Sequence, residues 1–121
     1  MAIETRTRIS GEAYERLAFA EPDRKWELRH GVLREKPGMT AAHNQLGMQL
    51  GYMLMSQLDW AGFQVRVDSG RVRRPHETYF IPVVFVVPAA LVAPLLDQQD
   101  VLEVYDQPLP CLLYTSDAAD E

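Results

Sequence analysis

The sequence has a single cysteine, Cys111, and this scarcity excludes two kinds of site. With no second cysteine, the chain has neither a disulfide framework of its own nor a cluster of thiolates for a metal ion. It also lacks a glycine-rich phosphate loop, a Ser-His-Asp arrangement and a paired-histidine zinc motif. Residues 1–10 lack the apolar segment of a secretory signal, so we expect a cytoplasmic protein.

Only one long apolar run is present, Tyr79–Leu96, and it approaches the length of a membrane helix. Prolines interrupt it at Pro82, Pro88 and Pro94, and each removes a helical N–H donor. The β-branched residues of Val83–Val87 favour a strand. We therefore expect a buried strand, a turn and a short helix here, with a membrane helix as the less favoured alternative.

The remaining composition is that of an ordinary globular protein. Of 121 residues, 47% are hydrophobic and 24% are charged, which is typical of one small soluble domain with one core. The net charge of −5 is mild, and acidic residues at 117, 120 and 121 contribute much of it. This charge identifies no class of partner and excludes none.

Local patterns predict a helix, a β-hairpin and a long helix in that order. Ser10 is a typical N-cap for a helix over residues 11–20, and alternation around His30-Gly31 predicts a hairpin. Thr40 is expected to cap a long helix over residues 41–62, in which Gly47 and Gly51 permit close approach of a neighbouring element. The apolar stripe expected to face the core comprises Leu46, Leu50, Met53 or Leu54, and Leu58.

A strand over Phe63–Val67 and the turn Asp68-Ser69-Gly70 lead into a second basic strand, as in a hairpin. The overall order of elements indicates an α/β or α+β fold. Four arginines form the only basic concentration: Arg66, Arg71, Arg73 and Arg74. Such a cluster can bind nucleic-acid phosphates, or it can be the solvated face of an edge ribbon, and both interpretations are open.

Two further residues are candidates for chemistry. Glu27 follows Trp26 in the first strand, and it is either a solvated charge beside Lys25 and Arg29 or a site carboxylate. His43 lies in the first turn of the long helix, where it is either exposed or a ligand. The residues alone favour the exposed interpretation of both.

Two segments resemble a known family. KWELRHGVLREKPGMTAAHNQ, residues 25–45, is similar to the opening motif of the Uma-two family of restriction endonucleases, and SGRVRRPHETYFIPVVFVVP, residues 69–88, resembles the next block. The resemblance extends in order from about Ser10 to Pro110. It implies the restriction-endonuclease-like PD-(D/E)xK fold, a DNA partner, and phosphodiester hydrolysis with Mg²⁺ held by carboxylates. By the same resemblance, Glu27 is a catalytic metal ligand and His43 a further site residue.

The chain departs from the family pattern in two places. Val83 follows Pro82 where the family has the metal-binding aspartate, and a valine offers no lone pair to a cation. After Pro110 the family continues with a strand that leads to a glutamate and a lysine, whereas this chain reads CLLYTSDAADE. That segment resembles the translation of the adapter DNA used in transposase-based sequencing libraries.

We therefore expect residues 1–110 to be the N-terminal portion of a Uma-two-type nuclease domain and residues 111–121 to be a non-native tail. Such a chain is expected to be inactive, to bind no Mg²⁺ productively, and to dissolve poorly because the edge of residues 80–87 is exposed. One alternative is a non-catalytic nucleic-acid-binding or protein-interaction module of the same fold. Another is a docking domain with no nucleic-acid role. The oligomeric state is not determined by the sequence.

Overall fold

The computed structural model describes residues 8–38, 40–98 and 102–113. These residues combine helices and strands, as the sequence predicts. The helices are α1 (Gly11–Ala20), α2 (Ala41–Gln57) and α3 (Ala89–Leu96). The strands are β1 (Trp26–Arg29), β2 (Val32–Glu35), β3 (Phe63–Val67), β4 (Arg71–Arg74), β5 (Thr78–Phe80), β6 (Val84–Pro88), β7 (Val104–Tyr105) and β8 (Cys111–Leu113).

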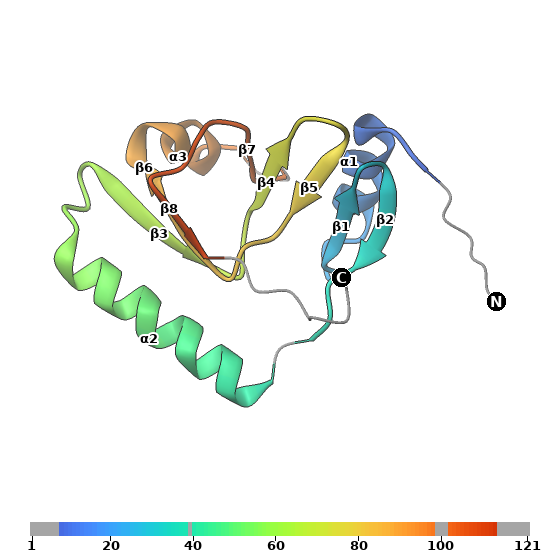
Figure 1. Cartoon of the computed structure of the whole chain (residues 1–121). Coiled ribbons are helices and arrows are strands. Elements are labelled where there is room, and N and C mark those ends of the chain that lie inside the picture. Colours follow the sequence, from blue (N-terminus) through green and yellow to red (C-terminus); the bar gives the residue numbers. More distant parts are fainter. Residues whose placement is uncertain (1–7, 39, 99–101, 114–121) are drawn as a thin grey trace.

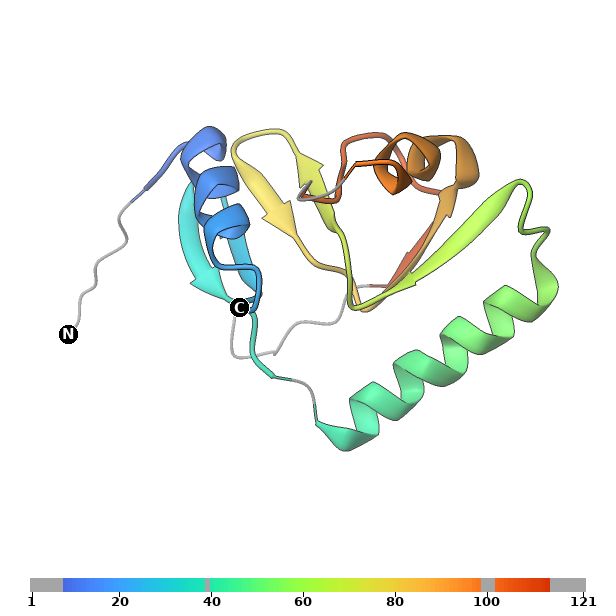
Figure 2. The ribbon, with the colours of Figure 1, turned by 180° about the vertical axis from the view of Figure 1, so that it is seen from behind.

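The strands form two sheets (Figure 1). The larger sheet has the order β2-β1-β5-β4-β7, and the smaller has the order β3-β6-β8. Pairing is antiparallel except between β4 and β7. Helix α1 packs on β1, whereas α2 and α3 pack on the smaller sheet, and Figure 2 shows α1 and α2 on separate parts of the molecule. The segment Ile81–Val83 connects β5 to β6 and therefore joins the two sheets.

The predicted local elements near the N-terminus are confirmed. Ser10 Oγ accepts a hydrogen bond from Ala13 N at 3.0 Å, and Thr40 Oγ1 accepts one from His43 N at 3.1 Å. The β1–β2 hairpin turns at His30-Gly31, where φ is +48° and +83°, as a two-residue type I′ turn requires. These features depend on residues close together in the sequence.

The predicted leucine stripe of the long helix faces the core only in part, with Leu50, Leu54 and Leu58 half-buried. The buried residues of α2 are Gly47 and Gly51, while Leu46 and Met53 are each 52% exposed. A Cβ atom on Gly47 would lie 3.1 Å from Val83 Cγ1, and one on Gly51 would lie 2.7 Å from Val67 Cγ2 in β3, so the helix backbone itself contacts the sheet. The two glycines thus permit the close approach that the sequence suggested. The helix ends at Gln57, earlier than the predicted Gly62.

The predicted hairpin between Phe63–Val67 and the following basic strand is also wrong. β3 pairs with β6, whereas β4 pairs with β5 and β7 in the other sheet. The turn directs the chain away because Asp68 and Gly70 both have positive φ, +50° and +84°, and Asp68 N donates to Val83 O at 2.7 Å. Arg66 therefore lies in a different sheet from the arginines of β4.

The apolar run at Tyr79–Leu96 forms the predicted strand and short helix, β6 and α3. Phe85, Val87 and Val92 are buried with Tyr105 in one apolar cluster. A second cluster contains Tyr14, Ala18, Leu28 and Tyr79, where α1 covers the larger sheet. Within the described residues, no helix is both long and apolar enough to cross a membrane.

The predicted exposed edge of residues 80–87 is not observed over β6. β3 pairs with one edge of β6, and β8 pairs with the other through Val84↔Leu113, Phe85↔Leu112 and Val86↔Cys111. The short Cys-Leu-Leu sequence continues the sheet where the resemblance expects another strand. The remainder of the predicted non-native tail, residues 114–121, lies outside the described residues.

Candidate functional site

Glu27 is a buried carboxylate in the middle of the larger sheet. It is 2% exposed, and its Oε2 accepts a hydrogen bond from Ile81 N at 2.8 Å. Arg34, its cross-strand neighbour on β2, places Nε 3.9 Å from Oε1. Glu27 and Arg34 also border a small cavity of about 210 Å³. The interpretation of Glu27 as a solvated charge is therefore wrong, because its side chain is buried and bonded to Ile81 N.

Lys36 brings a buried ammonium to the same segment. Its Nζ donates to Ile81 O at 2.8 Å and to Asp68 Oδ1 at 2.9 Å, and its side chain is 6% exposed. Lys36 N bonds to Lys25 O at 2.8 Å, which extends the hairpin ladder beyond β2. Since strand side chains alternate, Lys36 lies on the same face as Arg34 and its partner Glu27.

Asp68 completes this arrangement from the end of β3. Besides Lys36, it is approached by Lys25, whose Nζ lies 2.8 Å from Asp68 O and 3.6 Å from Oδ2. Its backbone N–H binds Val83 O, so Asp68 is adjacent to the position where the family resemblance expects an aspartate. We refer to the five residues that meet around Ile81 as the Ile81 charge cluster: Lys25, Glu27, Arg34, Lys36 and Asp68.

The Ile81 charge cluster does not fit a magnesium ion. Mg²⁺ requires several oxygen ligands in an octahedral arrangement, and Val83, 6% exposed and in contact with α2, provides none. One oxygen of Glu27 is bonded to an N–H group, and one oxygen of Asp68 to an ammonium. Among the described residues, no group of three or more His, Cys, Asp or Glu side chains is placed to hold a metal ion.

His43 is exposed in the first turn of α2. It precedes Gly47 by one helical turn, so the two residues share a helix face, and Gly47 contacts Val83. The contacts of the described residues do not join the His43 side chain to Glu27. The site role that the resemblance gives to His43 stays a prediction.

The four arginines do not form one free basic surface. Arg66 Nε binds Glu103 at 2.6 Å, and Arg71 Nε binds the Tyr14 hydroxyl at 2.7 Å. Arg73 binds Asp106 at 2.5 Å and approaches Glu15 at 3.4 Å, while Arg74 lies 6.0 Å from the centre of the Phe80 ring. The hydrogen bond from Arg73 lowers the pKa of Asp106. Arg74 also donates to Arg73 O at 3.3 Å, so all four arginines have polar partners within the described residues.

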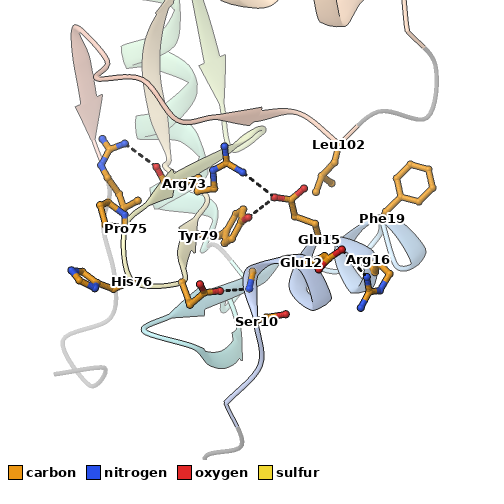
Figure 3. Close-up of a pocket in the computed structure, with 13 residues that line it drawn as sticks. Ser10, Glu12, Glu15, Arg16, Phe19, Arg73, Pro75, His76, Tyr79 and Leu102 are labelled. Carbon is orange, nitrogen blue, oxygen red and sulfur yellow. Dashed lines mark hydrogen bonds and ion pairs between the residues drawn. The ribbon is translucent and has the colours of Figure 1, made fainter.

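A larger hollow lies elsewhere, between α1 and the β4–β5 hairpin (Figure 3). It measures about 900 Å³, and Glu15 points into it toward Arg73 and Tyr79. The Tyr79 hydroxyl donates to Glu15, and burial raises the pKa of Tyr79. None of the Ile81 charge cluster lines this hollow. Its central charges already have partners, so the hollow has no evident reactive group.

Sequence reasoning placed Glu27 in a site but missed Lys36 and Asp68. Lys36 could have been found by continuing the alternation of the predicted hairpin two residues past Arg34. Asp68 gave no such signal, because a turn residue before glycine is common in any fold. No protein-family model matches the chain, and no curated protein sequence matches it.

Proposed function

We propose that this chain carries a nuclease-type domain with a restriction-endonuclease-like core of the Uma-two kind, and that its site around Glu27 does not cleave DNA. One observation carries the proposal. The buried Glu27 carboxylate binds Ile81 N, two residues before Val83, the position where the resemblance expects the metal-binding aspartate. Glu27 therefore contacts the segment that contains position 83, which the resemblance assigns to the same site.

The same geometry explains why this chain would be inactive. Metal-dependent phosphodiester hydrolysis needs a cation that polarises the phosphate and activates water, and this cation needs oxygen ligands. Val83 removes one ligand, and Lys36 occupies an oxygen of Asp68. Because Mg²⁺ does not fit the residues present, no catalytic step is assigned to Glu27 or His43 in this chain.

A plasmid-nicking assay tests the proposal. The purified chain is incubated with supercoiled DNA and Mg²⁺, beside Glu27→Ala and a chelator control. We expect no conversion to the nicked form above the buffer blank. Conversion that requires Mg²⁺ and disappears in Glu27→Ala would overturn the proposed inactivity. An independent read of the gene across codon 83 then tests the origin of the valine. Aspartate there supports an active parent nuclease.

A non-catalytic nucleic-acid-binding module is the second candidate, favoured by the pairing of the Lys36 ammonium with an oxygen of Asp68. It requires valine at codon 83 of the native gene and DNA binding that weakens steeply with salt. Fluorescence anisotropy with a labelled duplex measures this binding. Arg74→Ala should weaken it more than Arg66→Ala, since Arg66 is already bound to Glu103. Absence of binding at low salt favours instead a docking domain without a nucleic-acid role.

A further inference from the structure

The contacts of Lys36 point to a role that the sequence did not suggest. We propose that the Lys36 ammonium is the built-in cation of the Ile81 charge cluster and holds the oxygens that a divalent ion would otherwise take. The inference rests on the proposed function only in regarding the cluster as a site of metal-binding type. The contacts of Lys36 and the ion-binding test do not depend on whether the chain cleaves DNA.

The ligands of Lys36 are those of a hard cation. Its Nζ binds one carboxylate oxygen, Asp68 Oδ1 at 2.9 Å, and one backbone carbonyl, Ile81 O at 2.8 Å. Carboxylate and carbonyl oxygens are also the ligands that Ca²⁺ and Mg²⁺ take from proteins. An ammonium has three donors and no acceptor, so it suits a pocket of oxygens. At 6% exposure, the side chain is held inside the protein.

The charges around Ile81 make a buried cation necessary. Glu27 is 2% exposed, and a buried carboxylate without compensation is strongly unfavourable. Arg34 Nε lies 3.9 Å from Glu27 Oε1, and the Lys25 side chain is 46% exposed. Lys36 is the most buried of these three cations. It also binds the carbonyl of the residue whose N–H binds Glu27, so both charges fix Ile81.

It follows that Lys36 and a divalent ion compete for the same oxygens. Removing the ammonium while keeping the side-chain volume should leave Asp68 and the Ile81 carbonyl available as ligands. Glu27 lies beside them, because it accepts a hydrogen bond from Ile81 N. The variant Lys36→Met removes the ammonium in this way. Lys25→Met is its matched control, because it removes one positive charge from the same Asp68 but from an exposed side chain. Lys36→Arg keeps the charge at the buried position.

The test measures the melting temperature of the full chain and the three variants in increasing MnCl₂, and separately in CaCl₂. We expect Lys36→Met to be destabilised without metal and to recover several degrees with a saturable dependence on ion concentration. The melting temperature should change by the same small, non-saturating amount in the parent chain, in Lys25→Met and in Lys36→Arg. Isothermal titration calorimetry of Lys36→Met with MnCl₂ should show one site per chain.

Two results would overturn the inference. One is a folded Lys36→Met that neither ion stabilises, and the other is a parent chain that responds as strongly as Lys36→Met. If Lys36→Met is unfolded alone, circular dichroism decides: folding on addition of Mn²⁺ or Ca²⁺ supports the built-in cation, and continued unfolding at saturating ion contradicts it. Plasmid nicking by the parent chain would refute the proposed inactivity without changing these ion responses, so the two proposals fail separately.

Discussion

Gly51→Ala tests whether α2 contacts the sheet through its backbone. An added Cβ would lie 2.7 Å from Val67 Cγ2, well inside the usual separation of non-bonded carbon atoms. Val67 is β-branched and belongs to β3, so its side chain has little freedom to rotate away. Overpacking of this kind costs about 1–3 kcal/mol, whereas replacing glycine by alanine in a helix gains about 1 kcal/mol. We expect a net loss of about 1 kcal/mol, and at most about 2 kcal/mol, in the free energy of unfolding.

Urea unfolding followed by circular dichroism measures this loss. Gly38→Ala is the control, because no atom lies within 4 Å of a Cβ placed there. It should be neutral or stabilising by up to about 1 kcal/mol. Val67→Ala removes the clashing methyl groups, so its cost should be smaller in the Gly51→Ala background than in the parent, with a coupling above about 0.5 kcal/mol. Additive effects, or stabilisation by Gly51→Ala, would refute a backbone contact at this position.

Three further predictions concern the site, the core and the surface. Glu27→Ala should lower the free energy of unfolding by about 3 kcal/mol or more, because it leaves buried cations and an N–H group without their carboxylate. Glu27→Gln keeps an acceptor and should lower it less. Equal losses of the two variants in urea unfolding would contradict this. Burial raises the pKa of Tyr14 from 10.0 to about 12. The stability that it contributes is complete below pH 10 and is lost as the pH rises toward 12, so Tyr14→Phe should unfold with a shallower alkaline dependence, and an unchanged dependence would exclude Tyr14 as the cause. Met48 and Tyr52 are 54% and 70% exposed on α2, so the chain should self-associate with rising concentration in light scattering, and Met48→Lys with Tyr52→Lys should reduce this where the control Ala20→Lys does not.

Elements determined by neighbouring residues could be predicted from the sequence. The caps at Ser10 and Thr40 and the turn at His30-Gly31 each involve hydrogen bonds or backbone angles within a few positions. The core face of α2 could be predicted only in part: Gly47 and Gly51 indicated a close approach, but the predicted stripe included the exposed Leu46, since leucine and methionine occur on several sides of the helix. The face that packs is determined by how closely the backbone approaches Val67 and Val83, and only glycine permits that distance.

The candidate site shows a similar division. The alternation of β1 predicted which face of the strand Glu27 lies on, but not its contacts with Arg34 of β2 and with Ile81 after β5. Strand alternation could have placed Lys36 with it. Asp68 comes to the site only because β3 pairs with β6 instead of β4, which also made the hairpin prediction wrong. Local sequence patterns do not specify which distant strands pair.

The position of the Ile81 charge cluster gives Lys36 a structural consequence beyond charge balance. Ile81–Val83 joins the two sheets, and it is bound from the larger sheet by Glu27 and Lys36 and from the end of β3 by Asp68. The Lys36–Asp68 pair therefore links elements of both sheets directly. If a divalent ion held these oxygens, the contact between the two sheets would depend on the concentration of that ion. The Lys36 ammonium is covalently attached, so the contact persists at any metal concentration. A carboxylate restored at Val83 alone would then face oxygens that the Lys36 ammonium already holds, so the change that frees a cation site is the loss of this ammonium.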